Sequence, residues 1–359
     1  MGITIYDLAR EAGVGIGTVS RCLNNHPSVA AHTRAKVLAA AKRMSYQPHA
    51  HAQRLASRRT NSISAIIPYF TNYFFLQVLQ GVQDRASELG FDLILYGVNN
   101  PSDVEYYLRR SLQRGRVDGV LFFSMKFPES YASKFPQMNL PLVLVDTFHP
   151  AFDSLRVKNR EGARLATEHL IRLGHRRIAM LNASLNTLPS VERLEGYREA
   201  MAAAGLPPAT DLEFSSAIGG QDGFNRQSGR ESMRSLLEKV RGGHSCTAAF
   251  VASDIQALGA LEIAREQGVA VPGDLAIVGF DDIELAEHAD LTTMRQPLSE
   301  MGRLSMDRLV ARLQGASLPP MLKEFTPELV VRRSSGALPA LGGESVDRAG
   351  SRPSMTAAS

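Results

Sequence analysis

The pattern of apolar and polar positions changes at residue 63. Before it, three short helices fit residues 5–12, 17–24 and 32–44, and a fourth fits 49–57. Beyond it, short apolar runs alternate with amphipathic stretches, several of which end at a glycine. This alternation predicts an α/β architecture with parallel sheets and helices on both faces. The apolar runs predicted as strands are 63–68, 91–97, 118–124, 140–146, 177–183, 247–253 and 275–281. The stretches predicted as helices are 74–89, 102–114, 159–173, 190–204, 223–239 and 254–267.

The α/β part contains too many strands for one small sheet. A break near 157–160 divides it into two similar halves, each beginning with a strand and a loop that could face a shared cleft. The polar residues 57–62 have the composition of a linker, and His32 or Thr33 stands near the start of the third helix. Residues 337–359 are rich in Gly, Ser, Pro and Ala and are predicted to form a disordered tail.

The first two predicted helices have the spacing of a helix-turn-helix. Ala9 stands where two helices cross closely, and Gly13 follows where the turn needs a positive φ. Val19 then supplies a β-branched core residue from the second helix. An Ala-x-x-x-Gly match is weak by itself, but here Thr18-Val-Ser-Arg21 and Tyr46-x-Pro48 follow it. Together these features predict an N-terminal, all-α module that binds DNA.

The charge distribution supports this prediction. Residues 1–60 contain nine Lys or Arg and two acids, which gives +7, whereas the whole chain is +4. Residues 61–359 therefore carry −3, so the basic excess is local. A local basic excess is typical of a module that contacts phosphates. The alternative interpretation is a solvated basic helical face.

Composition indicates a globular chain of two or three compact units. Its 359 residues are 44% hydrophobic and 21% charged. The N-terminal residues lack the basic and apolar runs of a signal peptide, and no apolar stretch reaches membrane-spanning length. Cys22 and Cys246 fall in different predicted domains, so a disulfide framework is not expected. These features predict a cytoplasmic protein without a membrane partner.

Further motifs extend the helix-turn-helix pattern along almost the whole chain. They include Ile5-x-Asp7-Leu-Ala-x-x-Ala-Gly-Val14, Thr33-Arg34-x-x-Val37, Ala52-x-x-Leu55, Asp118-Gly119-Val120, Arg193-Leu-x-Gly-Tyr197, Ala252-Ser-Asp254 and Val278-Gly-Phe-Asp-Asp282. With these motifs the chain resembles the lactose-repressor (LacI) family of bacterial transcription regulators over roughly residues 3–335. The resemblance implies a homodimer that binds double-stranded DNA at a pseudo-palindromic operator and is controlled by a small molecule.

The resemblance also implies a domain organisation. A helix-turn-helix domain is expected at 1–48, and a hinge helix with its linker at 49–61. A periplasmic-binding-protein-like core is expected at 62–336. Its N-subdomain is expected at about 62–158 plus 292–322, and its C-subdomain at about 159–291 plus 323–336.

For the DNA-binding end, the resemblance places the second helix in the major groove and residues 49–57 in the minor groove. There Leu55 is expected to wedge into the central base step. Gly15 and Gly17 depart from the family pattern, because an N-cap hydroxyl and a base-reading side chain are usual at these positions. Each of two DNA contacts has an alternative interpretation. Arg21 could be an ordinary surface arginine that does not bind DNA, and Leu55 could pack on its own domain. The residues expected to contact DNA are Thr4, Ile16, Gly17, Thr18, Ser20, Arg21, Asn24, Thr33, His49, Ala52 and Leu55.

For the core, ligands of two-domain α/β folds bind between the halves, at the C-terminal ends of the strands. Carboxylates at Asp146 and Asp281 and the planar donors of Arg193 suit a polyhydroxylated ligand. Aromatic side chains suit the C–H face of a sugar or a nucleobase. The alternatives are a structural ion pair between Arg193 and Asp281, and a loop-bracing role for Asp254. The residues expected at the effector site are Asn72, Tyr73, Phe74, Ser124, Asp146, Arg193, Phe224, Ser253, Asp254 and Asp281.

The predicted function is a repressor of carbohydrate-metabolism genes with a sugar effector. Alternatives within this class are a purine or a phosphocarrier protein as corepressor. A sugar-binding transport component would leave residues 1–60 without a role and would need an export signal. An enzyme would need a nucleophile, metal or phosphate loop, and the sequence contains no Gly-x-Ser-x-Gly, Walker A, Cys-x-x-Cys or His-Glu-x-x-His motif. His169 and His175 are six apart, which does not fit a zinc pair on one helix face, so no metal or cofactor is expected.

Overall fold

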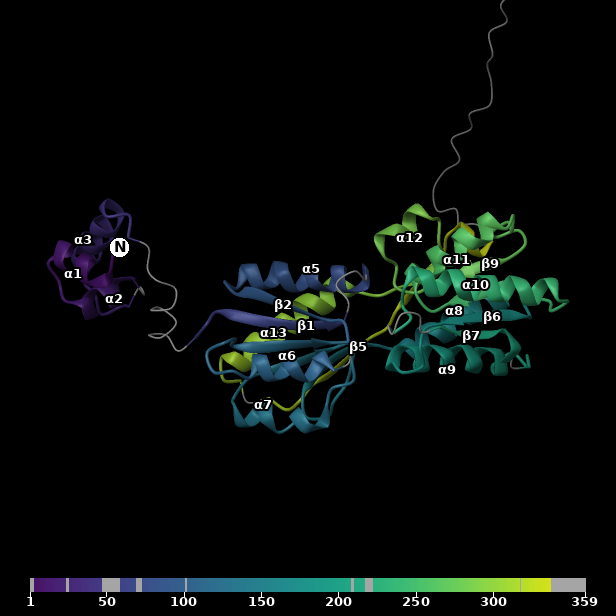
Figure 1. Ribbon diagram of the computed structural model, residues 1–359, viewed down its shortest axis with the longest axis horizontal. Coiled ribbons are helices and arrows are strands. Elements are labelled where there is room, and N and C mark those ends of the chain that lie inside the picture. Colours follow the sequence, from purple (N-terminus) through teal and green to yellow (C-terminus); the bar gives the residue numbers. More distant parts are fainter. Residues whose placement is uncertain are drawn as a thin grey trace, which may run out of the picture. The chain divides into compact units, whose positions relative to one another are not determined.

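The computed structural model divides into two units, which Figure 1 shows as ribbons. One contains Met1–Thr60, and the other contains Asn61–Gln113 and the chain from Asp118 onward. The predicted hinge helix at 49–57 and the predicted tail at 337–359 lie outside the described residues. The structure describes residues 3–23, 26–46, 59–68, 73–100, 102–207, 210–216, 222–316 and 318–336.

The described N-terminal unit is a bundle of α1 (Ile5–Ala12), α2 (Ile16–Leu23) and α3 (Ala31–Arg43). Its core contains the buried side chains of Leu8 and Val19, among others. Burying such side chains is the main source of stability in so small a unit.

The ends of these helices differ in how they are capped. Thr4 and Asp7 form a capping box at the start of α1, and Gly13 ends it in the left-handed conformation, at φ 60°. This confirms the turn predicted at Gly13. The third helix, predicted at 32–44, begins one residue earlier at Ala31, and its N-cap, Ala30, supplies no side-chain hydrogen bond.

The N-subdomain of the core is built on a six-stranded parallel sheet in the order β11-β5-β4-β3-β1-β2. Alternate residues of the inner strand β1, which lies between β3 and β2, face opposite layers. Ile63 and Ile67 pack with the α5 and α13 side, whereas the Ser64 hydroxyl lies 3.1 Å from that of Ser111 on α6. The strands are β1 (Ser62–Pro68), β2 (Asp92–Val98), β3 (Gly119–Phe123), β4 (Leu142–Val145), β5 (Asp153–Val157) and β11 (Leu322–Phe325). The helices are α5 (Tyr73–Glu88), α6 (Asp103–Ser111), α7 (Lys134–Gln137) and α13 (Leu298–Leu313).

The C-subdomain has a four-stranded parallel sheet in the order β7-β6-β8-β9. Helices α8 and α9 pack on one face, and α10 and α11 on the other. A two-stranded antiparallel sheet, β10-β12, completes it. The strands are β6 (Ile178–Asn182), β7 (Glu213–Ser215), β8 (Ala248–Val251), β9 (Ala276–Val278), β10 (Thr293–Arg295) and β12 (Glu328–Val330). The helices are α8 (Asn159–Arg172), α9 (Leu188–Ala203), α10 (Arg226–Arg241), α11 (Asp254–Glu266) and α12 (Glu284–His288).

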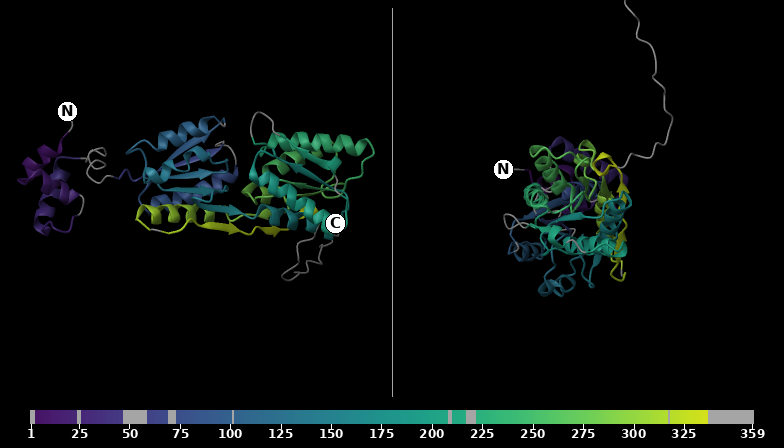
Figure 2. Two further views of the ribbon diagram at one scale, coloured as in Figure 1. Left: turned by 90° about the horizontal axis from the view of Figure 1, so that it is seen from below. Right: turned by 90° about the vertical axis from the view of Figure 1, so that its right-hand side faces the viewer.

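The chain passes between the two subdomains three times: between β5 and α8, between β10 and α13, and between β11 and β12. Figure 2 shows the C-terminal segment of the core running along both subdomains. The second and third crossings lie close to the boundaries predicted at about 292 and 322. Arg295 of β10 bridges to Asp281 in the C-subdomain, and β11 pairs with β5 in the N-subdomain sheet. The second and third crossings therefore follow Arg295 and Phe325.

Several elements lie outside the predicted set: β5, β7, β10, β11, β12, α7, α12 and α13. The strands among them are short or carry charged residues at exposed positions, so they lack a continuous apolar run. The predicted helix at 223–239 begins instead at Arg226, because the Asn225 side chain caps it by accepting from the backbone N–H of Ser228.

Two histidines and two cysteines were considered for metal or disulfide chemistry, and neither was expected. His169 lies 3.0 Å from the Ser335 hydroxyl, and His175 lies 2.9 Å from that of Thr247. Cys22 and Cys246 are both buried free thiols. Among the described residues, no helix is both long and apolar enough to cross a membrane.

Candidate functional site

Helix α2 presents one face to the core of the N-terminal unit and the other to solvent. Val19 and Cys22 are buried, while Ile16, Gly17 and Arg21 are exposed. The Arg21 Nε donates a hydrogen bond to the Gly17 carbonyl at 3.1 Å, which lays the arginine along the exposed face. The predicted contacts Thr18 and Ser20 are half-buried on the same helix.

Two other predicted DNA contacts belong to neighbouring helices. Thr4 caps α1, and Thr33 lies in the first turn of α3, where its hydroxyl is 3.1 Å from His32 Nε2. Thr4 therefore has a structural role as the N-cap of α1, in addition to its predicted role as a DNA contact. The predicted contacts that lie outside the described residues are Asn24, His49, Ala52, Leu55 and, at the effector site, Asn72.

The basic residues of the N-terminal unit do not all have the same role. Arg34 is half-buried and donates from its guanidinium to the carbonyls of Cys22 and His26, so it ties α3 to the end of α2. Arg43 pairs with Glu11 at 3.0 Å. Arg21 carries its positive charge on the exposed face of α2, where phosphates or base edges can reach it.

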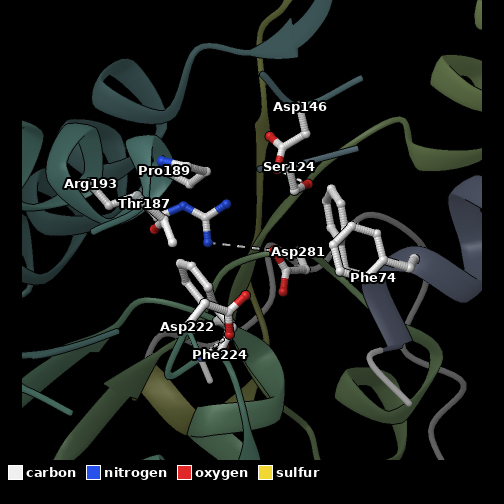
Figure 3. A pocket seen from close by; sticks show the side chains of 11 residues that line it. Phe74, Ser124, Asp146, Thr187, Pro189, Arg193, Asp222, Phe224 and Asp281 are labelled. Carbon is white, nitrogen blue, oxygen red and sulfur yellow. Dashed lines mark hydrogen bonds and ion pairs between the residues drawn. The ribbon is translucent and has the colours of Figure 1, made fainter. Parts of the chain in front are cut away.

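The core contains a pocket between its two subdomains (Figure 3). Polar residues reach it from the C-terminal ends of parallel strands in both: Ser124 follows β3, Asp146 follows β4, and Asp281 comes shortly after β9. This is the edge at which open α/β sheets bind ligands. The residues that line the pocket are Phe74, Phe75, Ser124, Asp146, Thr187, Pro189, Arg193, Asp222, Phe224, Ser253 and Asp281.

Three of these polar residues have strained backbones. The φ angles of Ser124, Asp146 and Asp281 are 49°, 56° and 127°. Residues other than glycine rarely adopt such positive φ angles. Each such conformation costs on the order of 1–3 kcal/mol and is typical of ligand-binding sites. All three line the same pocket, whereas the other positive-φ residues that are not glycine, among those described, lie outside its lining.

Arg193 is the central cation of the pocket. Its side chain comes from α9 and is 4% exposed, and its Nη1 lies 3.7 Å from Asp281 Oδ1. Its Nε donates to Asn159 Oδ1 at 2.9 Å, and its Nη1 also donates to the carbonyl of Ala252. The guanidinium stacks over the Phe280 ring, 3.8 Å from the centroid. These contacts hold its planar donors towards the pocket, as Figure 3 shows.

The acidic groups are shifted towards their neutral forms by burial. Burial raises the pKa of Asp146 to about 6, although a hydrogen bond from the Ser124 hydroxyl at 2.6 Å opposes the shift. Burial also raises the pKa of Asp281, opposed by the nearby Arg193 charge, and Gln296 donates to this carboxylate at 2.6 Å. Burial raises the pKa of Asp222 as well. Such shifts in a cleft are typical of binding or catalytic sites.

Aromatic rings supply the apolar part of the lining. Phe74 and Phe75 of α5 form an edge-to-face pair with centroids 5.1 Å apart, and Phe224 lies 5.4 Å from the Arg193 guanidinium. The cavity volume of the pocket is about 30 Å³.

Seven of the predicted effector residues line this pocket, and two described ones do not. Tyr73 instead lines a groove beside α11 and α12. Asp254 is fully buried and braces a loop, because it accepts from the Thr293 hydroxyl at 2.6 Å and from the Ile283 N–H at 3.0 Å. The seven are Phe74, Ser124, Asp146, Arg193, Phe224, Ser253 and Asp281.

Four lining residues were not predicted: Phe75, Thr187, Pro189 and Asp222. Thr187 caps the start of α9, and Pro189 occupies its first turn. A Thr-x-Pro helix start that follows a buried strand is a signal in the sequence that could have located this part of the pocket.

Comparisons with known proteins cover both units. Residues 4–49 match the family "Bacterial regulatory proteins, lacI family", and residues 167–335 match "Periplasmic binding protein-like domain". The regulator DegA of Bacillus subtilis is 34% identical over 349 residues, covering 94% of this chain and 99% of that protein. The ribose operon repressor of Escherichia coli is 34% identical over 341 residues, covering 92% and 99%.

Solved structures give the same picture. A lac repressor dimer bound to operator and the anti-inducer ONPF matches with a TM-score of 0.81 and 28% identity, covering 93% of this chain and 99% of that one. A complex of the transcriptional regulator CelR with cellobiose matches with a TM-score of 0.68 and 32% identity, covering 92% and 99%.

Proposed function

Because the chain belongs to the LacI family of bacterial transcription regulators, we propose that it represses carbohydrate-metabolism genes in response to a sugar. It is a DNA-binding transcription regulator, not an enzyme. The cytoplasm, where the chromosome lies, is its proposed compartment. What the family leaves open is the effector, and the pocket supplies the evidence on that point.

The observation that carries the sugar proposal is the combination of Arg193, the carboxylates and the phenylalanine rings in one buried pocket. A carboxylate accepts hydrogen bonds from two neighbouring hydroxyls, and a guanidinium donates several in one plane. Aromatic faces pack against the C–H side of a sugar ring. Among the relatives, one solved structure contains cellobiose and another contains ribose.

The charges in the pocket favour an uncharged sugar over a sugar phosphate. Among the described lining residues, Asp146, Asp222 and Asp281 face one guanidinium, that of Arg193. A phosphate brought into this buried site would meet more negative than positive charge, at a high desolvation cost. The proposed effector is therefore a neutral mono- or disaccharide.

A homodimer on a pseudo-palindromic operator is part of the same proposal, because two helices α2 are needed to reach two half-sites. The groove beside α11 and α12 offers a contact surface for the second copy. Its lining includes half-buried Leu258, Leu261, Val271 and Leu285, rimmed by the charged Arg226. Apolar surface surrounded by polar groups is typical of protein interfaces.

Operator-binding titrations test the proposal. Duplex DNA flanking the gene is titrated with the full-length protein, alone and with ribose, cellobiose, ribose 5-phosphate or hypoxanthine. A neutral sugar is expected to change the operator affinity at least several-fold, and ribose 5-phosphate is not. A response to hypoxanthine alone would favour a purine corepressor, and the absence of salt-dependent, site-selective binding would contradict the whole proposal.

An exposed ion pair provides the matched control. Arg160 pairs with Glu199 in the C-subdomain, away from the pocket lining. The response to the active sugar should disappear in Arg193→Met and persist in Arg160→Met.

A further inference from the structure

A continuous series of side-chain contacts leads out of the pocket. Arg193 Nε donates to Asn159 Oδ1 at 2.9 Å, and Asn159 Nδ2 donates to Glu192 Oε2 at 3.3 Å. The other oxygen of Glu192 lies 3.2 Å from Arg156 Nη1, and Arg156 pairs with Glu324 at 2.8 Å. Five side chains thus connect the central cation of the pocket to the sheet of the other subdomain.

The members of this series come from different subdomains. Arg156 on β5 and Glu324 on β11 are register partners in the N-subdomain sheet. Glu192 lies on α9 of the C-subdomain, immediately before Arg193. The Arg156–Glu192 ion pair therefore joins the two subdomains directly.

The contacts also reach each crossing between the subdomains. Asn159 is the first residue of α8, directly after the first crossing, and Glu324 stands just before the third. At the second crossing, Gln296 donates to Asp281, the pocket carboxylate that lies beside Arg193. A change in the position of Arg193 can therefore act on all three crossings through neighbours that it contacts by hydrogen bonds or, at Asp281, by an ion pair.

Burial makes the Arg156–Glu192 pair sensitive to geometry. The Glu192 side chain is 16% exposed and that of Arg156 is 24% exposed. Burial raises the pKa of Glu192, which means that its carboxylate is poorly solvated in the absence of a partner. Losing one partner of a buried pair costs more than the pair itself contributes. Subdomain angles that keep the pair closed are consequently favoured over angles that open it.

We propose that Arg156 and Glu192 are positioning residues that fix the angle between the subdomains and transmit a change at Arg193 to the three crossings. A ligand that draws the Arg193 guanidinium away from Asn159 frees the amide that also holds Glu192. The pair then loosens and the subdomains turn. The role of an effector in this step rests on the proposed function, but the contacts can be tested without any effector.

Distance measurement by electron paramagnetic resonance tests the proposal. Spin labels are placed at Met138→Cys in the N-subdomain and Ser235→Cys in the C-subdomain, both exposed positions. Cys22 and Cys246 are buried, so the introduced thiols react first. Diluting labelled chain with a large excess of unlabelled chain before assembly isolates the distance within one protomer. The unsubstituted pair should give one narrow distance distribution, and Glu192→Gln should broaden it and shift its maximum.

Several variants separate positioning from general destabilisation. Arg156→Met should reproduce the Glu192→Gln change, and Arg156→Lys, which retains the charge, should largely restore the narrow distribution. Glu199→Gln is the matched control, because Glu199 pairs with Arg160 within the C-subdomain. Narrow, unshifted distributions in both Glu192→Gln and Arg156→Met would overturn the proposal, and so would an equal broadening in Glu199→Gln.

The connection to the pocket has its own variant. Asn159→Ala removes the amide between Arg193 and Glu192 and is expected to broaden the distribution as Glu192→Gln does. A narrow distribution in Asn159→Ala would overturn the transmission from Arg193. Because no sugar and no DNA enter the measurement, failure here is distinguishable from failure of the operator titrations.

Discussion

The proposed DNA-contacting side chains of α2 and the lining of the pocket are assembled in opposite ways. Ile16, Gly17 and Arg21 lie within six residues of one helix, and all are exposed. The pocket lining comes from segments between Phe74 and Asp281, and its charged groups Asp146, Arg193 and Asp281 are buried. The helix surface depends on local spacing, whereas the pocket depends on the packing of two sheets.

The N-terminal unit and the pocket also differ in the backbone strain of their residues. The N-terminal unit has left-handed backbone at Gly13, where the conformation costs little, and at Ser45 just after α3. The pocket places left-handed backbones at Ser124, Asp146 and Asp281, where it is costly. Substitutions in the pocket should therefore change stability and binding together, whereas replacing the exposed Arg21 side chain of α2 should change binding with little effect on stability.

The largest expected effect is in Arg193→Met. Removing this buried cation leaves Asp281 and Asp146 without their opposing charge, which should lower the free energy of unfolding of the core by roughly 3–5 kcal/mol. Urea unfolding followed by circular dichroism measures it. Arg160→Met, which removes an exposed arginine, should leave the unfolding curve unchanged. Equal stability of the two variants would show that the buried carboxyl groups of the pocket do not depend on the Arg193 charge.

A second effect depends on pH. The pKa of Asp146 is about 6 in the folded protein, above its ordinary value of 3.8, so the folded state holds this proton more tightly than the unfolded state. Stability is therefore lost as the pH rises from about 4 to about 6, by roughly 3 kcal/mol at 1.4 kcal/mol per pH unit.

Asp146→Asn tests this dependence because the asparagine cannot ionise. Across the same pH window, the variant should gain stability relative to the unsubstituted protein and then stay level. Unfolding free energies at several pH values check this, with the exposed Asp92→Asn as a control that should show no such trend. A difference that is constant with pH would show that Asp146 is solvated like an ordinary carboxyl group.

The two regions also differ in how far the sequence predicts them. The helices of the N-terminal unit and the turn at Gly13 follow from local spacing and one conformational requirement. In the pocket, residues directly after apolar strands, such as Ser124 and Asp146, were predicted because a buried strand is recognisable locally. Asp222 was missed because its position depends on how the segment before α10 packs, which leaves no periodic signal.

Asp254 is the opposite case to Asp222: it was predicted at the effector site but does not line the pocket. It follows an apolar strand just as Asp146 does, so the local pattern is the same. The difference arises from Thr293, which is distant in sequence and donates to Asp254 from the β10 strand. The partners of a buried carboxylate are set by tertiary packing, and the sequence pattern around it does not contain them.

A third prediction concerns Arg21→Gln on the exposed face of α2. Operator affinity should fall by about 1–3 kcal/mol, with loss of selectivity if Arg21 contacts a base, or with a smaller salt dependence if it contacts phosphate. Stability should change by less than about 0.5 kcal/mol, since the side chain is exposed. Fluorescence anisotropy with operator and scrambled duplexes measures the first, and thermal unfolding the second. A large loss of folding stability in Arg21→Gln would contradict the expectation that this exposed side chain affects DNA binding and not folding.

The smallest expected effect comes from a pair of glycines in the N-terminal unit. Gly13 has φ 60°, so Gly13→Ala should destabilise the unit by about 1–2 kcal/mol, the cost of a left-handed alanine. Gly17 lies inside α2, where a Cβ would come no closer than 3.8 Å to Arg21, so Gly17→Ala should stabilise the unit by up to about 1 kcal/mol. Urea unfolding of both variants gives the two signs directly. If both substitutions shift the unfolding transition in the same direction, the backbone at Gly13 does not require a glycine more than the backbone at Gly17 does.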